Sequence, residues 1–189
     1  MIKKMKNILI INNSLDKNNF DFVKNITKVV SCPGIHYSEI TPDILKGYEG
    51  IILSGNSLEE ENAVKRNIPY YQWIMDTEKA VLGICAGHQI IAKLFGSQII
   101  HRKNKHMGMC DVFVDNPSPI LNGCSKKFIV YHLHKDIGRL PQVFMLLAHS
   151  HNNEVEVMKH RSRPIWGIQF HPEKTKKGRL ILKNFTKLV

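Results

Sequence analysis

The chain has 189 residues, of which 43% are hydrophobic, and this suits one compact domain over residues 1–189 with a sizeable buried core. No apolar run approaches the roughly 20 residues that a membrane-spanning helix needs, so we expect no membrane association. The apolar stretch near the N-terminus is also too short for a secretory signal, whose apolar region takes about 7 to 15 residues. These features predict a cytoplasmic protein.

The formal net charge of +11 is large for this size, and lysines spread along the chain supply most of it. Such a positive surface favours an acidic protein partner or non-specific contact with nucleic acid. The sequence contains no recognisable nucleic-acid-binding motif, so we expect no specific nucleic acid partner. The four cysteines show no C-x-x-C spacing, which argues against a zinc knuckle or a redox pair.

Short apolar runs alternate with amphipathic stretches in the first half of the chain, a pattern typical of α/β folds. The first amphipathic stretch places Phe22, Ile26 and Val29 on one helix face. Gly96 fits the left-handed position that often ends a helix. The elements expected in this half are a strand at 7–11, a helix at 18–30, a strand at 50–55, a helix at 70–78, a strand at 80–84 and a helix at 86–95.

The second half contains more candidate strands and one terminal helix. The segment Arg161-Ser-Arg-Pro164 separates two of the strands and predicts a hairpin turn. The elements expected here are strands at 111–114, 128–133, 144–148, 154–159 and 165–170, followed by a helix at 178–188. No repeat, low-complexity linker or domain boundary interrupts the sequence, which again favours a single domain.

The most informative segment places Cys85 between a buried strand and a helix, with Gly83 and Gly87 on either side. This G-x-C-x-G pattern is the cysteine counterpart of the nucleophile elbow, in which a strained turn needs small neighbours. The helix dipole favours a thiolate at this position, and the N–H of Ala86 points to where an oxyanion would form. A buried structural cysteine fits the same pattern, so the pattern alone does not decide between the two.

A partner for the thiol follows the strand expected at 165–170, where His171 is succeeded by Glu173. Residues at i and i+2 of an extended chain point to the same side. Glu173 can therefore hydrogen-bond one imidazole nitrogen while the other nitrogen faces a thiol, the arrangement that orients a catalytic base. Cys85, His171 and Glu173 are the predicted catalytic residues.

Two segments, Gly83-Ile-Cys-Ala-Gly-His-Gln89 and Gly167-Ile-Gln-Phe-His-Pro-Glu173, together resemble the signature stretches of the class I, triad-type glutamine amidotransferases. The resemblance implies a flavodoxin-like, three-layer α/β fold with a mostly parallel central sheet. It also implies hydrolysis of L-glutamine to glutamate and ammonia through a thioester on Cys85. The segments His134-Lys-Asp136 and Leu147-Ala-His-Ser150 look most like the separate glutaminase subunit of archaeal-type GMP synthetases.

The same resemblance implies a role for each site residue. His171 would transfer protons, and Glu173 would orient its imidazole. The oxyanion would be held by the main chain of Gly55, Asn56 and Ala86, and the glutamine α-amino and α-carboxylate groups by Gln89, Leu133 and His134. This half-reaction needs no cofactor and no metal. An ATP-pyrophosphatase synthetase subunit would bind the ATP and Mg²⁺ and use the ammonia to convert XMP to GMP, since this chain lacks a glycine-rich phosphate loop.

Some positions depart from that pattern. Asn56-Ser57 stands where the oxyanion loop commonly has Gly-Pro, although asparagine tolerates positive φ better than other non-glycine residues. Leu133 stands where the GMP synthetase type usually has serine. His106-Met-Gly108 and His171-Pro-Glu-Lys-Thr175 resemble instead the glutaminase subunit of imidazole glycerol phosphate synthase. A stand-alone γ-glutamyl hydrolase and a non-catalytic regulatory relative are further alternatives.

Two His-x-His pairs, His132 with His134 and His149 with His151, each point two imidazoles to one side of a strand. Imidazoles in such pairs can bind zinc. Polar residues at the edge of an active site, or chance in a histidine-rich chain, are the simpler explanation, so we expect no metal here.

Overall fold

A computed structural model describes residues 7–58, 60 and 62–189 of the chain, and the lysine-rich N-terminal residues 1–6 lie outside the described residues. The strands are β1 (Ile8–Asn12), β2 (Gly34–His36), β3 (Gly50–Leu53), β4 (Ala80–Ile84), β5 (Ile99–Val114), β6 (Lys127–Gly138), β7 (Phe144–Ser150), β8 (Asn153–His160) and β9 (Ile165–Ile168). The α-helices are α1 (Asp21–Val30), α2 (Pro42–Lys46), α3 (Ala63–Asn67), α4 (Ala86–Leu94) and α5 (Lys176–Leu188).

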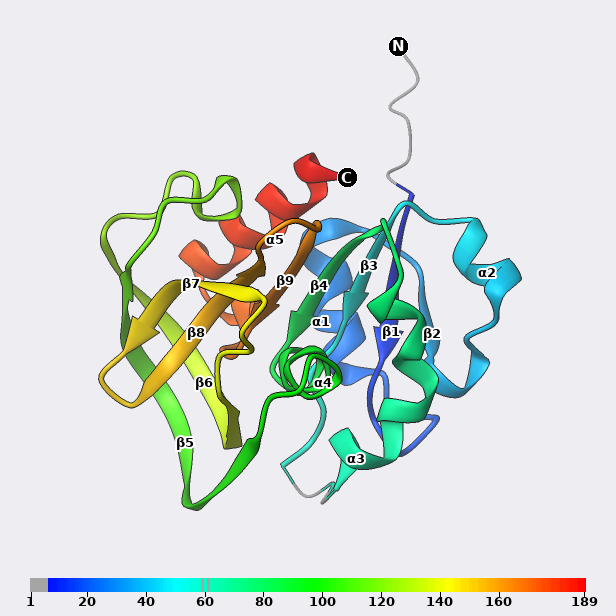
Figure 1. The fold of residues 1–189 in the computed structure, drawn as a ribbon, viewed down its shortest axis with the longest axis horizontal. Coiled ribbons are helices and arrows are strands. Elements are labelled where there is room, and N and C mark those ends of the chain that lie inside the picture. Colours follow the sequence, from blue (N-terminus) through cyan, green and yellow to red (C-terminus); the bar gives the residue numbers. More distant parts are fainter. Residues whose placement is uncertain (1–6, 59, 61) are drawn as a thin grey trace.

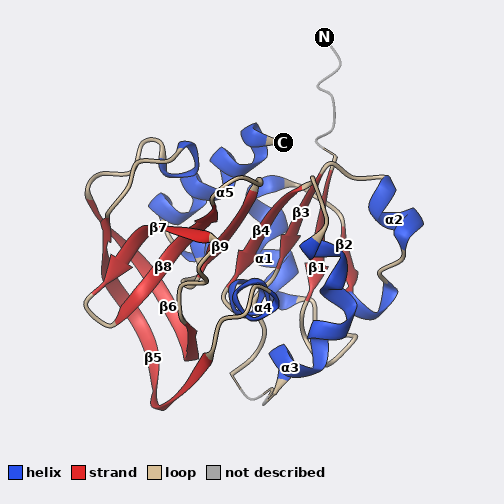
Figure 2. Cartoon of the chain, viewed as in Figure 1, coloured by secondary structure: helices blue, strands red, loops and turns tan. Residues whose placement is uncertain are grey.

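These strands form one sheet of nine strands within the described residues, in the order β2-β1-β3-β4-β9-β8-β7-β5-β6 (Figures 1 and 2). The strands from β2 to β9 in this order pair in parallel. The remaining strands extend the sheet by antiparallel pairing. The parallel order has the flavodoxin-like arrangement, so the predicted α/β fold with a mostly parallel centre is confirmed.

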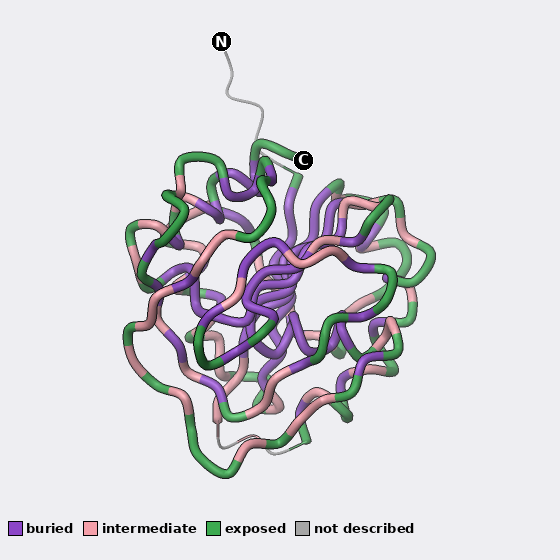
Figure 3. The backbone as a smooth tube through the Cα atoms, turned by 60° about the vertical axis from the view of Figure 1, so that its left-hand side comes forward, coloured by how far each residue is buried: buried purple, intermediate pink, exposed green. Residues whose placement is uncertain are grey.

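The helices cover both faces of the parallel strands (Figure 1). Successive side chains of β1 point to opposite faces of the sheet. Ile8 and Ile10 pack with α1 and α5 on one face, and Leu9 and Ile11 pack with α2 and α4 on the other. All four side chains are fully buried, and Figure 3 shows the central strands as the most buried part of the chain. Continuous apolar runs therefore identify these strands because both of their faces lie inside the protein.

Three features of the fold differ from the sequence prediction. The helix expected at 70–78 is a 3-10 helix over Ile68–Met75, in which the buried residues Tyr71 and Ile74 recur at the three-residue period of that helix. Strand β5 begins twelve residues earlier than expected, because its first part is polar and partly exposed and shows no apolar run. The short elements β2, α2 and α3 were not predicted.

The carboxyl ends of the parallel strands meet at one edge of the sheet, where open α/β sheets usually bind their ligands. Cys85 follows β4 there, Gly55 lies in the loop after β3, and His171 lies just beyond β9. No α-helix in the described part of the chain is long and apolar enough to cross a membrane. The predicted site residues therefore share one edge of the sheet, although they come from distant parts of the chain.

Candidate active site

Cys85 occupies a strained turn between β4 and α4. Its backbone has φ 50° and ψ −102°, an unfavourable conformation for a residue with a side chain, and it caps the N-terminus of α4. A Cβ atom on Gly83 would lie 2.4 Å from the carbonyl oxygen of Gly87, and one on Gly87 would lie 2.6 Å from Leu53 Cβ. Both glycines are therefore required sterically, and the turn holds the thiol at the positive end of a helix.

His171 is held by hydrogen bonds on both sides of its ring. Its Nδ1 lies 3.0 Å from Glu173 Oε1, and its Nε2 lies 3.3 Å from the carbonyl oxygen of Leu133. The backbone N–H of His171 donates to the carbonyl oxygen of Tyr131, which ties the end of β9 to β6. Both ring acceptors are oxygens, so this geometry suits an imidazolium, which carries a proton on each nitrogen.

The thiol of Cys85 lies beside the same Leu133 carbonyl, with Sγ 3.7 Å from the oxygen. Burial by itself lowers the pKa of His171, but Cys85, through its charge and hydrogen bonding, and then Glu173 raise this pKa to about 10. The side chains of His171 and Glu173 are almost completely buried. The predicted triad residues therefore lie together, and the environment favours a positively charged His171 at neutral pH.

The loop after β3, to which the family resemblance assigns the oxyanion, approaches this group closely. A Cβ atom on Gly55 would lie 2.9 Å from His171 Cε1 and 3.4 Å from Cys85 Cβ, so the absence of a side chain lets the loop approach. The backbone φ of Asn56 is not positive, so this loop does not use the tolerance of asparagine for that conformation. In the described part of the chain, the non-glycine residues with positive φ are Ser31, Asn62 and Cys85.

A cleft of about 630 Å³ opens in front of Cys85. The predicted glutamine-binding residues line it together with residues of the oxyanion loop: Asn56, Gln89, Leu133 and His134. The Gln89 amide donates to the carbonyl oxygen of Asp136 at 2.8 Å, and Asp136 also lines the cleft. The cleft is large enough for an amino acid and brings polar groups to one side of the thiol.

Two residues near the thiol were not predicted. The Gln169 amide lies 3.9 Å from Cys85 Sγ and its Oε1 accepts a long hydrogen bond of 3.5 Å from Gln89. The ring of Phe22 contacts that of His171, with centroids 5.4 Å apart. Gln169 stands two residues before His171, so the i and i+2 relation used for Glu173 was an available signal for it. Phe22 was predicted only as part of an apolar helix face.

The two His-x-His pairs have different surroundings. His149 hydrogen-bonds the Asp115 carboxylate at 2.8 Å, and His151 is exposed with its ring edge against Phe113. His132 and His134 are buried and lie side by side, with 3.1 Å between two of their nitrogens. The pairs therefore do not combine into one four-histidine site.

The arrangement around Cys85 has the parts needed for nucleophilic attack on a carbonyl carbon. A thiol at a helix N-terminus lies beside a buried imidazole, whose orientation a carboxylate fixes. Backbone N–H groups at the start of α4 have no partner within the helix and face outward from its end. Such a constellation forms a thioester, releases a leaving group that has taken a proton from the imidazolium, and hydrolyses the thioester with water.

Comparison with known proteins relates the chain to enzymes with this chemistry. The family model of class-I glutamine amidotransferases matches residues 14–188. The glutamine-hydrolyzing GMP synthase subunit from Methanococcus aeolicus is 38% identical over 146 residues, which cover 76% of this chain and 75% of that protein. The corresponding subunit from Sulfurisphaera tokodaii is 32% identical over 167 residues, with coverage of 85% and 89%.

Solved structures show the same relationship. A crystal structure described as that of a GMP synthase subunit from Thermoplasma acidophilum superimposes with a TM-score of 0.81 at 30% identity, covering 97% of this chain and 94% of that one. A glutamine amidotransferase from Thermotoga maritima shares the fold, with a TM-score of 0.70 at 20% identity and coverage of 88% and 76%. The fold and the sequence similarity thus extend over nearly the whole chain.

Proposed function

The chain belongs to the class-I glutamine amidotransferase family, and on this basis we propose that it hydrolyses L-glutamine with Cys85, His171 and Glu173 as its catalytic residues. The observation that supports this assignment best is the meeting of a thiol on a strained elbow with a buried imidazole that a carboxylate orients. In this reaction glutamine and water give glutamate and ammonia. The enzyme is of the GMP synthase glutamine-hydrolysing type.

The first half of the reaction makes a thioester. The Cys85 thiolate attacks the side-chain carboxamide carbon of glutamine, and the carbonyl oxygen becomes an oxyanion. The N–H of Ala86 and an N–H of the Gly55–Asn56 loop stabilise this oxyanion. His171 gives its proton to the nitrogen, the carbon–nitrogen bond breaks, and ammonia leaves a γ-glutamyl thioester.

The second half restores the enzyme. His171, now neutral, removes a proton from a water molecule that attacks the thioester carbon, and the carbon–sulfur bond breaks to give glutamate and the thiolate. Glu173 holds the imidazole in one orientation through both halves, as its 3.0 Å contact with Nδ1 supports. The proton that left with ammonia is thereby replaced, so the Cys85–His171 pair returns to its starting state.

The cleft supports recognition of the α-amino and α-carboxylate groups of glutamine. Gln89 and the backbone at Leu133 and His134 line it beside Cys85, and the Asp136 carboxylate provides an additional group to contact an ammonium. The Leu133 carbonyl contacts both Cys85 and His171, so the strand that binds the substrate also positions the reacting groups. Binding and chemistry are thus linked through β6.

We propose that the ammonia passes to a separate ATP-pyrophosphatase synthetase subunit, which binds ATP and Mg²⁺ and converts XMP to GMP in the cytoplasm. Support comes from the relatives, which are glutamine-hydrolyzing subunits of GMP synthases. A partner could dock at the mouth of the cleft and on the basic tract Lys174–Lys177, next to the triad. No cofactor, specific nucleic acid or membrane enters this proposal.

The proposal is tested by measuring glutamate release from glutamine with the chain alone and with the ATP-pyrophosphatase subunit, XMP, ATP and Mg²⁺. We expect turnover in the complex, and we expect Cys85→Ala to lower it by about 10³-fold or more. Cys110→Ala is the matched control, because Cys110 lies on β5 and does not line the cleft.

The result separates this proposal from its alternatives. Equal activity of Cys85→Ala and the parent would remove the catalytic assignment, and binding of glutamine without turnover in either condition would indicate a non-catalytic relative. Turnover that needs no partner would indicate a stand-alone γ-glutamyl hydrolase. Stimulation of turnover by the cyclase subunit of imidazole glycerol phosphate synthase, and not by the ATP-pyrophosphatase subunit, would contradict the proposed synthetase partner but not the proposed glutamine hydrolysis.

A further inference from the structure

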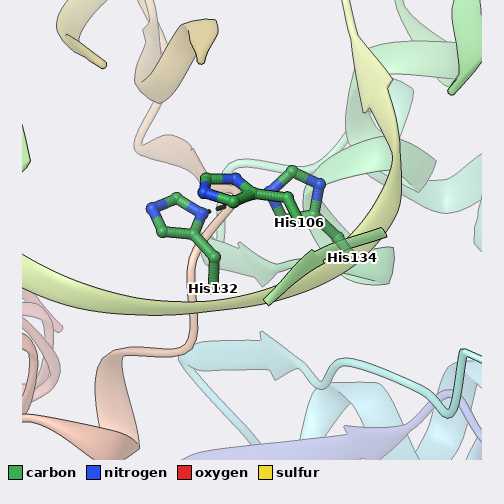
Figure 4. Close-up of side chains that lie close together, drawn as sticks. All are labelled: His106, His132 and His134. Carbon is green, nitrogen blue, oxygen red and sulfur yellow. Dashed lines mark hydrogen bonds between the residues drawn. The ribbon is translucent and has the colours of Figure 1, made fainter. Parts of the chain in front are cut away.

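Three histidines gather on one face of the antiparallel strands, outside the triad. His132 and His134 are two residues apart on β6 and so point to the same side, and His106 on β5 is the cross-strand partner of His134. One nitrogen from each ring lies within 4.8 Å of the other two (Figure 4). Among the described residues, this is the one group of histidines, cysteines or carboxylates with metal-binding spacing.

The distances between nitrogens approach those of a metal site. His132 Nδ1 and His134 Nε2 are 3.1 Å apart. Two nitrogens bound to one tetrahedral zinc ion, each at about 2.0–2.1 Å, lie about 3.3 Å apart. An ion that brought both nitrogens into its coordination sphere would therefore need only a small movement of these two side chains.

In His132 and His134, the ring nitrogen that points away from the cluster faces the kind of group that usually orients a metal-binding histidine. His134 Nδ1 lies 3.2 Å from the carbonyl oxygen of Asp136, which can only accept, so Nδ1 carries the proton and Nε2 presents its lone pair to the cluster. His132 Nε2 faces the buried Glu156 carboxylate at 3.7 Å. A backbone carbonyl and a carboxylate are the usual partners that orient metal-binding imidazoles from behind.

The cluster also contains buried polar atoms that lack hydrogen bonds. Within the described residues, His132 Nε2, Glu156 Oε2 and His106 Nδ1 are buried without such a partner. His132 and Glu156 are completely buried, so an unmet hydrogen bond there is costly. Metal binding at His132 Nδ1 would place the ring proton on Nε2, which faces Glu156, and a closer approach of these two side chains would then make a hydrogen bond. The ring of His106 would supply a further ligand.

We propose that His106, His132 and His134 form a binding site for one divalent transition-metal ion of the zinc type, with a fourth position open to water. Three imidazoles and no carboxylate in direct reach favour zinc, cobalt, nickel or copper over magnesium and calcium, which prefer oxygen ligands. The contact of His134 Nδ1 with the Asp136 carbonyl leaves Nε2 for the ion, and a metal binds an imidazole in its neutral form.

One side chain must move for the ion to bind. The ring of His106 stacks on that of His132, with centroids 4.3 Å apart and planes at 19°, and it has to turn edge-on toward the ion. His106 is only partly buried, which leaves room for this rotation. The site lies directly behind Leu133, whose carbonyl contacts Cys85 and His171, so a bound ion would link β5 to the strand that positions the triad.

The test uses a metal-free Cys85→Ser protein, in which zinc cannot bind the Cys85 thiol beside His171. Titration with Zn²⁺ by calorimetry and with Co²⁺ by visible absorption should give one ion per chain and the intense bands of tetrahedral Co²⁺. In the same background, His106→Gln should raise the Kd for Zn²⁺ at least tenfold. His151→Gln, which removes an exposed histidine that is not part of the cluster, should leave the Kd unchanged.

Each alternative result overturns the site. An absence of Zn²⁺ binding, an equal Kd for His106→Gln and the Cys85→Ser parent, or an equal loss in His151→Gln would contradict it. Because His106 is partly exposed, its variant should keep the fold, which circular dichroism checks, and His106→Cys should retain Zn²⁺ binding by supplying another ligand. None of these measurements depends on glutamine hydrolysis, so the site and the proposed function can fail separately.

Discussion

Among the described residues, two histidine–glutamate pairs lie fully buried, one at the end of the parallel strands and one among the antiparallel strands. In the first, His171 Nδ1 lies 3.0 Å from Glu173, within hydrogen-bond distance. In the second, His132 Nε2 lies 3.7 Å from Glu156, too far for a hydrogen bond. The same two side-chain types therefore meet at similar depth with different geometry.

The two pairs have opposite electrostatics. Burial lowers the pKa of His171 too, but Cys85 and Glu173 outweigh it and raise this pKa to about 10. At His132, burial and then the charges of neighbouring histidines lower the pKa to about 2, while burial raises the pKa of Glu156 to about 8. Burial alone thus favours a neutral pair, and at His171 the interactions with Cys85 and Glu173 outweigh its effect.

The largest expected difference between the two pairs is the effect on glutamate release of replacing each histidine. We expect His171→Gln to lower the rate of glutamate release by about 10³-fold or more, because the leaving nitrogen loses its proton donor. His132→Gln should lower it by less than about tenfold, because His132 does not line the cleft in front of Cys85. Steady-state glutamate release by the complex with its synthetase subunit measures both, and similar losses in both variants would contradict the difference between the pairs.

Replacing each glutamate should give a smaller difference in catalytic rate between the two pairs. Glu173→Gln keeps an oxygen that can accept from His171 Nδ1 but removes the negative charge, so we expect a loss of about 10²-fold in kcat. It should also lower the upper pKa of the pH–rate profile, since Glu173 helps to raise the pKa of His171. Glu156→Gln is the matched control with a buried glutamate, and its profile should coincide with that of the parent.

Sequence patterns were sufficient for the charged pair because its members are close in the chain. The spacing of His171 and Glu173 predicted their contact, although Glu173 lies in a 3-10 helix over Pro172–Lys174 and not in an extended segment. The glycines around Cys85 predicted the elbow. The apolar runs predicted the parallel strands, because strands buried on both faces are continuously apolar.

The neutral cluster was not predictable in the same way. It depends on the pairing of His106 with His134 across β5 and β6, next to an irregularity in the register between His101 and His106. The first part of β5 is polar, so no apolar pattern indicated a strand there, and His-x-His spacing alone did not show which other histidine lies opposite. Cross-strand register is long-range information that a single sequence does not contain.

The smallest expected difference between the two pairs is in how the free energy of unfolding depends on pH. The folded-state pKa of His171, about 10, exceeds the value of 6.5 expected when it is unfolded, so folding takes up a proton between these values. The stabilisation by this proton is complete below pH 6.5 and is lost as the pH rises toward 10. Between about pH 7.5 and 9.5 the parent should therefore lose roughly 2 kcal/mol of unfolding free energy relative to His171→Gln.

Urea unfolding of parent and variant at several pH values across this window measures that difference, and titratable groups that do not interact with His171 cancel between the two chains. His132→Gln is the comparison, because His132 is neutral in both the folded and the unfolded chain above about pH 7.5, so its difference from the parent should stay constant with pH. Cys85→Ser should reduce the pH dependence assigned to His171, because Cys85 contributes most to its raised pKa. A parent–His171→Gln difference that does not vary with pH would show that His171 is neutral in the folded protein, and the charged and neutral pairs would then differ only in geometry.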